Sequence, residues 1–331
     1  NNVELQKEGF LPEYGGRLSS MVNITLKEGN QERIGGEITT GLISSKATIE
    51  GPLNNQITYI CSFRRNYFDL FTRLVMPLLI EDLSMGYNFY DLNGKFSYNV
   101  NRRNSVHFIF YSGDDNLSFE YYDRNGSKDK VKIGEKWGNF AASVNTKSTL
   151  SSRLQLSNDL YFLRYRLRDH YLQSFEKPEI FEYERSILSG IRDFGVKSDL
   201  EFFLNNNYNI YLGIDLKYHQ YAPSALIENG YATLGRLITD NAMDLAAYIN
   251  QTINTRKLSI KSGVRIIYYS GLKENQNVFL EPRLGFSIKA NANLVFTGSF
   301  DKMHQFVHNL SSPGNIMNSE IFTPVTDKVP P

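Results

Sequence analysis

The chain has 331 residues, with 36 basic and 35 acidic side chains, and this balance gives no electrostatic reason to expect a nucleic-acid partner. Hydrophobic residues make up 41% of the chain, yet no run reaches the roughly 18 apolar residues that a membrane-spanning helix needs. A single cysteine, Cys61, excludes an intrachain disulfide and a cysteine metal cluster. The aromatic content is 13%, and this abundance of Tyr and Phe favours β structure.

The N-terminal residues 1–33 differ in pattern from the rest of the chain. Gly15 and Gly16 permit a tight turn with positive φ, because glycine has no Cβ. The residues that follow, Ser20 to Lys27, predict one extended strand.

The remainder of the chain alternates between apolar and polar residues with period two. Between residues 210 and 218 the even positions are apolar, whereas Tyr211, Gly213, Asp215 and Lys217 stand between them. The same criterion and the turn signals predict about twelve strands. We place them near 35–51, 55–67, 86–99, 104–117, 134–148, 151–168, 186–203, 207–221, 240–254, 257–271, 281–290 and 293–302.

The predicted strands are long, and their connections alternate between short and long. Short polar turns separate one set of neighbours, and longer connections fall near 68–85, 118–133, 169–185, 222–239 and 272–280. This sidedness is typical of an outer-membrane β-barrel with tight periplasmic turns and long extracellular loops. The alternative, a large soluble propeller or solenoid, would show a fixed sequence repeat, and we find none.

The prolines provide a check on these strands, because proline cannot donate a ladder hydrogen bond. We place Pro52 in a turn, Pro282 at the start of a strand, and the other prolines outside the strands. No strand interior is expected to contain proline.

Several short motifs resemble TonB-dependent outer-membrane receptors, especially those of the Bacteroidetes. Residues 14–20, Tyr-Gly-Gly-Arg-Leu-Ser-Ser, and the Lys-Glu-Gly at 27–29 resemble the end of the plug domain. Residues 49–52, Ile-Glu-Gly-Pro, are similar to the first barrel turn, and residues 322–331 to an extracellular segment. The resemblance implies an all-β chain, with residues 1–33 as the C-terminal end of a plug domain. Residues 34–331 would form the N-terminal part of an antiparallel transmembrane β-barrel, about 12 of 22 strands.

The same resemblance implies a receptor for active transport, located in the cell outer membrane as a multi-pass β-barrel. Such a receptor binds a scarce ligand, which is a siderophore, a cobalamin, a glycan or a peptide. It imports the ligand with energy from TonB and its inner-membrane complex, contacted through an upstream TonB box. Outer-membrane lipids and a surface lipoprotein are further expected partners, and no cofactor is implied.

Two alternative functions stay open at the level of the sequence. A passive porin, or a structural or adhesive outer-membrane barrel, would lack the plug signature at residues 12–29. An outer-membrane lipase would need a Ser/His pair at the barrel edge, and no such spacing stands out. Because nucleophile elbows, phosphate loops and zincin motifs are also missing from the sequence, we expect no enzymatic activity.

The candidate site residues follow from the resemblance and from the strand periodicity. The plug motif is Tyr14, Gly15, Gly16 and Arg17, and receptors of this kind hold the plug by ion pairs to the barrel wall. Arg17 is therefore expected to pair with Glu37 or Glu50, and the alternative is an ordinary surface charge. Periodicity places a further group in the lumen: Arg64, Tyr211, Asp215 and Lys217.

Two apparent metal motifs have simpler interpretations. His304 and His308 have i,i+4 spacing but no accompanying Glu-x-x-His or cysteine, so no metal site is predicted. Asp114 and Asp115 lack the twelve-residue EF-hand pattern and are interpreted as a solvated loop tip.

Overall fold

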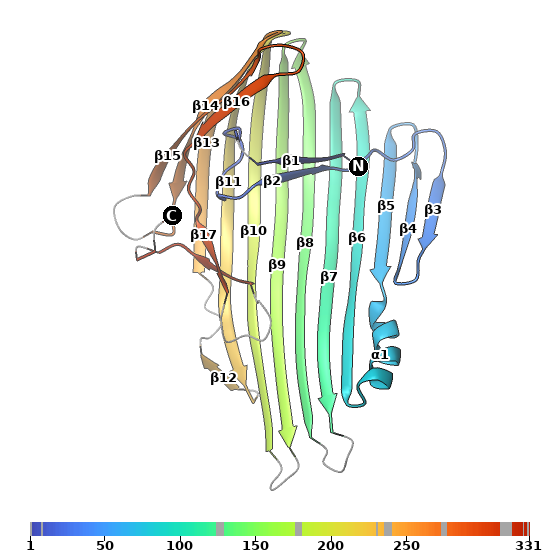
Figure 1. Ribbon diagram of the computed structural model, residues 1–331. Coiled ribbons are helices and arrows are strands. Elements are labelled where there is room, and N and C mark those ends of the chain that lie inside the picture. The colour runs from blue at the N-terminus through green and yellow to red at the C-terminus, as the bar shows by residue number, and fades with distance from the viewer. Residues whose placement is uncertain are drawn as a thin grey trace.

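A computed structural model of the chain describes residues 2–7, 9–123, 129–175, 181–229, 231–234, 240–272, 277–311, 320–326, 328, 329 and 331. One large antiparallel sheet dominates it, and a two-stranded ribbon from the N-terminus crosses the face of this sheet (Figure 1). The ribbon pairs β1 (Asn2–Gln6) with β2 (Met21–Thr25). The strand predicted over residues 20–27 is therefore present as β2.

The large sheet has fourteen strands, and thirteen of them follow one another in chain order. The first seven are β3 (Gly35–Thr40), β4 (Ser44–Pro52), β5 (Ile57–Asn66), β6 (Leu83–Asn101), β7 (Asn104–Tyr122), β8 (Lys130–Ser151) and β9 (Leu154–Phe175). The others are β10 (Phe181–Asn205), β11 (Tyr208–Glu228), β13 (Asp240–Asn254), β14 (Leu258–Tyr269), β15 (Val278–Lys289) and β16 (Val295–Asp301), and β12 (Tyr231–Leu234) pairs with β11 alone. This up-and-down antiparallel order confirms the predicted all-β fold.

The strand predicted over residues 35–51 is two strands, which corrects the predicted number. Residues 41–43 turn the chain between β3 and β4, and the Gly41 amide donates to the Ser44 carbonyl at 2.8 Å. This turn was missed because its residues, Gly-Leu-Ile, carry no polar turn signal. Leu42 is 97% exposed, so an apolar side chain occupies the turn tip.

Most of the predicted long loops are continuations of strands. For example, β7 continues to Tyr122 and β9 to Phe175, and α1 (Phe68–Leu79) occupies part of the first connection. In these extensions the alternation of apolar and polar residues is lost, because polar residues occupy both faces of the strands. Asp114 and Asp115 consequently lie within β7, on its opposite faces, and the loop-tip interpretation is wrong.

Pro282 lies inside β15, where the sequence analysis expected no proline. The Lys302 amide donates to the Pro282 carbonyl at 3.2 Å, so the missing N–H of Pro282 points to the same side, beside β16. Because β16 ends at Asp301, no ladder bond is lost at this position. Pro52 is the last residue of β4.

The two faces of the sheet differ in chemistry. We call the face against which residues 9–29 pack the inner face, and the opposite one the outer face. Asp215 on the inner face is 3% exposed, whereas its neighbour Ile214 on the outer face is 58% exposed. In the described part of the chain no helix is both long and apolar enough to cross a membrane.

The largest buried apolar cluster also lies on the inner face. The strands β17 (Val307–Ser311) and β18 (Glu320–Pro324) pair with each other, and β18 contacts β10 and β11. Phe306 and Val325 from this C-terminal segment pack with Tyr221, Ile267 and Tyr269 of the sheet. The described residues after β16 therefore cover the sheet and do not extend it.

Gly29 provides a test of how closely the N-terminal segment approaches β5. A Cβ added at Gly29 would lie 2.1 Å from the Tyr59 carbonyl oxygen, and this backbone atom cannot move aside cheaply. We expect Gly29→Ala to destabilise the docked segment by about 1–3 kcal/mol. Thermal unfolding and limited proteolysis in detergent measure this, with Gly35→Ala as the control because an added Cβ there meets no atom within 4 Å. Equal behaviour of the two variants would contradict the close approach.

Candidate functional site: the inner face and the segment docked on it

Two buried arginines of the sheet hold the backbone of the N-terminal segment. Arg265 of β14 donates to the Pro12 carbonyl at 3.2 Å, and Arg283 of β15 donates to the Leu11 carbonyl at 2.8 Å. The exposed fractions of Arg265 and Arg283 are only 2% and 3%. A buried charge is costly unless it is paired, so each arginine needs a carboxylate partner.

Both arginines have such partners on neighbouring positions of the sheet. Asp215 of β11 lies 3.1 Å from Arg265 and 3.0 Å from Lys217. Glu281 is fully buried and lies 2.6 Å from Arg283. The Glu281 carboxylate also accepts a hydrogen bond from the His304 amide at 2.7 Å, which fixes the position of His304 beside it.

The two glycines of the plug motif have different physical roles. A Cβ on Gly15 would lie 2.7 Å from Nε of Arg265, so only glycine permits this approach to the wall. Gly16 has open space around it but a φ of +82°, which favours glycine for backbone reasons. The Gly-Gly pair therefore combines a close contact with a left-handed turn.

A second set of ionic contacts holds the other end of the segment. Glu28 accepts hydrogen bonds from Lys95 and Ser97 of β6, both of which are buried. Lys27 lies 2.9 Å from Glu50 of β4. The segment is thus attached to the sheet at both ends by charged groups.

The structure brings Lys27, and not Arg17, to the predicted wall carboxylate. Among the described residues, Arg17 donates to the Gly16 carbonyl at 3.1 Å, and Glu37 accepts from the Thr39 hydroxyl at 3.2 Å. Lys27 belongs to the Lys-Glu-Gly sequence at residues 27–29, which resembles the end of the plug domain. The residue that pairs with Glu50 therefore lies within the resemblance, but it is not the arginine that was predicted. The other missed residues, Arg265 and Arg283, are charges in the middle of predicted strands, which is the signal that could have identified them.

The four predicted lumen residues all lie on the inner face. Arg64 donates to Asp91 at 2.8 Å, and Tyr211 stacks on Tyr248 with ring centroids 6.4 Å apart. Asp215 and Lys217 belong to the cluster around Arg265. Their charges are therefore partly committed to contacts within the wall.

A cavity of about 540 Å³ lies where Arg17 faces the sheet. Its wall includes Trp137 and Tyr165, and Phe322 of β18 closes it from the other side. The rings of Tyr165 and Phe322 are nearly perpendicular, with centroids 5.2 Å apart. This cavity joins the plug motif, the sheet and the C-terminal segment in one place.

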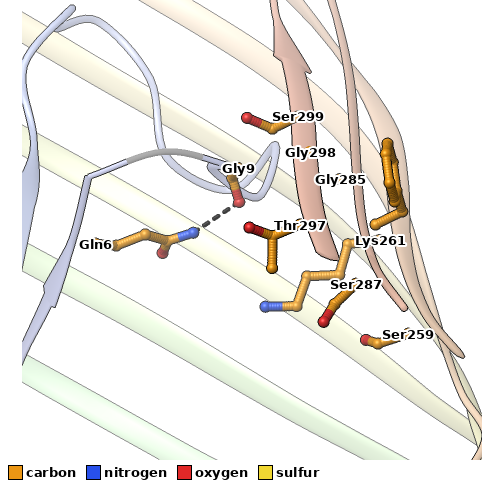
Figure 2. Close-up of a pocket in the computed structure, with 10 residues that line it drawn as sticks. Gln6, Gly9, Ser259, Lys261, Gly285, Ser287, Thr297, Gly298 and Ser299 are labelled. Carbon is orange, nitrogen blue, oxygen red and sulfur yellow. Dashed lines mark hydrogen bonds between the residues drawn. The ribbon is translucent and has the colours of Figure 1, made fainter. Parts of the chain in front are cut away.

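A second cavity, of about 350 Å³, separates the N-terminal segment from β14, β15 and β16 (Figure 2). Gln6 borders it and donates to the Gly9 carbonyl at 2.7 Å, and the Lys261 side chain extends toward its middle. Hydroxyl side chains supply most of the remaining lining: Ser259, Ser287, Thr297 and Ser299. Within the described ranges no group of three or more His, Cys, Asp or Glu side chains could hold a metal ion.

Comparisons with known proteins show similarity in fold to outer-membrane transporters. The outer-membrane transporter YddB of Escherichia coli has a TM-score of 0.61 at 12% identity, and the match covers 92% of this chain and 47% of YddB. The siderophore receptor PirA of Acinetobacter baumannii has a TM-score of 0.59 at 12% identity, covering 97% and 51% of the two chains. FpvA of Pseudomonas aeruginosa, solved with bound pyoverdines, has a TM-score of 0.60 at 12% identity, covering 92% and 46%.

The chain spans about half the length of these structures, and at this identity the likeness concerns the fold alone. No family model and no curated protein matches the sequence. The predicted fold, an antiparallel sheet corresponding to about half of a TonB-dependent receptor barrel, is confirmed.

Two carboxyl groups of the N-terminal segment predict opposite effects of pH on docking. Burial raises the pKa of the Glu28 carboxyl, but hydrogen bonds from Lys95 and Ser97 and the Lys95 charge outweigh it and lower that pKa overall. Burial raises the pKa of Glu13 above its ordinary value, against the lowering effect of Lys197. The Glu28 contribution is therefore present above the ordinary value of 4.5 and is lost as pH falls through the lowered pKa.

We expect acid to loosen the segment around Glu28, and Glu28→Gln to remove this acid sensitivity. Hydrogen–deuterium exchange of residues 21–29 between pH 3 and pH 6, corrected for intrinsic rates, measures the effect as faster exchange at the lower pH. The control is Glu13→Gln, which should stabilise docking most at the higher pH, since it removes a carboxylate that is costly to ionise. Unchanged acid sensitivity in Glu28→Gln would contradict the assigned role of Glu28.

Proposed function

We propose that this chain is part of an outer-membrane receptor for active transport, whose N-terminal segment belongs to a plug. The observation that carries the proposal is a segment held by polar and ionic contacts on the charged face of a sheet whose opposite face is apolar. A passive porin or an adhesive barrel needs no such segment across its lumen. Import of a scarce ligand coupled to TonB and its inner-membrane complex is the function that this arrangement supports best.

The outer face supports a location in a lipid bilayer. Its middle is a continuous belt of exposed apolar side chains that crosses most of the strands, including Phe63, Leu92, Phe108, Val144, Leu160, Phe194, Ile214, Leu245, Ile266 and Phe286. Apolar area on this scale is unfavourable in water and favourable in hydrocarbon. The belt is bounded toward the long connections by polar side chains such as Asp114 and Arg166, as expected where strands leave the hydrocarbon.

The contacts of the docked segment are suited to release. Arg265 and Arg283 bind backbone carbonyl groups of residues 11 and 12, and water can replace these carbonyl groups when the segment moves. The carboxylate partners of both arginines belong to the sheet and would stay in place. At these two contacts the segment can change position without leaving either arginine unpaired. Lys95 differs, because its carboxylate partner Glu28 belongs to the segment and would leave with it.

Genetic epistasis on a panel of nutrient-limited media tests the coupling to TonB. We expect deletion of the full-length receptor gene and deletion of TonB to give the same growth defect on the nutrient that the receptor supplies, and the double deletion to be no worse. Restoration by the wild-type gene but not by a gene with Arg265→Ala and Arg283→Ala would connect transport to the docking contacts. A receptor defect that adds to the TonB defect would contradict energy coupling.

The lipid-facing assignment predicts a dependence on depth along β11. Ile214 is in the middle of the apolar stretch, and Tyr218 is at its end. In the full-length protein Ile214→Arg should cost about 2–4 kcal/mol, and Tyr218→Arg about 0–1 kcal/mol. Reversible unfolding in lipid vesicles measures both. Both positions are solvent-accessible in the chain alone, so two equally small costs would argue for water and not hydrocarbon at this face.

A further inference from the structure

The register of β6 to β10 aligns inner-face side chains into rows. Four of these rows lie between the docked segment and the long connections. Directly paired residues of antiparallel strands share a face, so each row crosses five strands. Four successive rows, from the cavity toward the long connections, are Asn93–Tyr111–Ala141–Leu163–Asp193, Asp91–Gly113–Asn139–Tyr165–Ile191, Phe89–Asp115–Trp137–Leu167–Ser189 and Tyr87–Leu117–Glu135–Asp169–Ile187. We call these four rows the upper wall.

The upper wall is acidic. It contains five carboxylates and neither lysine nor arginine; the carboxylates are Asp91, Asp115, Glu135, Asp169 and Asp193. Among the described residues, Arg64 of β5 binds Asp91 at one margin, and His219 of β11 lies 2.7 Å from Asp193 at the other. An anionic ligand approaching these rows would meet a repulsive field.

The upper wall is also aromatic. Each of its four rows contributes at least one ring, from the set Tyr87, Phe89, Tyr111, Trp137 and Tyr165. Two of these rings, Trp137 and Tyr165, line the cavity of about 540 Å³ together with Phe322. Hydroxyl and carboxylate oxygens stand beside the rings, as where Tyr87 donates to Asp115 at 2.7 Å.

Two arginines border the cavity but do not make it basic. Arg17 of the docked segment and Asp193 of β10 both line the cavity. Arg164 belongs to the outer-face positions of β9, where its guanidinium group stacks over the Phe140 ring at 5.9 Å. The inner-face side chains that line the cavity are therefore aromatic, aliphatic, amide or acidic, and none of them is basic.

We propose that the upper wall and this cavity bind a neutral, hydroxyl-rich ligand of the saccharide class and reject anionic ligands. Carboxylates and the Asn139 amide oxygen accept hydrogen bonds from ligand hydroxyl groups. Flat rings such as Trp137 cover the apolar C–H faces of a sugar, which gives affinity without charge. The inference names the ligand class of the proposed transport function and rests on that function only for the direction of import.

The full-length receptor on a glycan array tests the proposal, with neutral, acidic and amino-bearing glycans printed together. An anionic ferric catecholate complex and a lysine-rich peptide are measured in the same format. We expect binding to neutral glycans. Trp137→Ala should weaken it at least roughly tenfold, Trp137→Phe should restore most of it, and Asp115→Asn should weaken it without favouring anions. The matched control is Phe162→Ala, an aromatic truncation on the outer face of the adjacent strand.

Each other outcome overturns the ligand class. Binding limited to acidic glycans, to the ferric complex or to the lysine-rich peptide contradicts it, and so does an array on which no neutral glycan binds. The proposed transport function fails separately. Neutral-glycan binding with uptake that survives TonB deletion refutes the coupling alone, whereas TonB-dependent uptake of the ferric complex refutes the ligand class alone.

Discussion

The continuous backbone ladder from β3 to β16 is the constraint on which the other features depend. Directly paired residues in neighbouring antiparallel strands share a face, so fixing the face of one residue fixes that of its whole row. Once Asp215 and Arg265 lie on the inner face, Ile214 and its outer-face neighbours must point the other way. The division into a charged face and an apolar face is therefore a property of register, and it holds across the sheet.

Charge on the inner face creates a second constraint, because burying an arginine without a partner costs several kcal/mol. The sheet meets this cost within itself, through Asp215 and Glu281, before the N-terminal segment adds its carbonyl groups. The segment thus gains a defined position from the arginines, whose own charges stay balanced without it. The buried Lys95 is the exception, because it relies on Glu28 of the segment for its partner.

Much of the fold could be predicted from sequence, but only where one face was consistently apolar. The stretch from Ile210 to Tyr218 identified β11 because its residues alternate between apolar and polar. Such alternation arises where one face of a strand meets an apolar environment and the other face a polar one. The turn at residues 41–43, the helix α1 and the extensions of β6 to β10 carry no such contrast, so periodicity missed them. The contacts of the site were harder still, because Lys27 and Arg17 are both cations close in sequence, and only the path of the chain decides which one reaches Glu50.

The position of Arg17 links ligand contact to the state of the segment. Arg17 lies on the docked segment and Trp137 on the sheet, and both line the same cavity. A ligand that touches both residues would bind across the boundary between the docked segment, which moves in the proposed mechanism, and the sheet, which is fixed by its ladder. Its affinity must then differ between the docked and displaced positions of the segment, because one side of the cavity is lost on displacement. By reciprocity, a ligand of the proposed transport function would also stabilise the docked position, and displacement of the segment would weaken its binding.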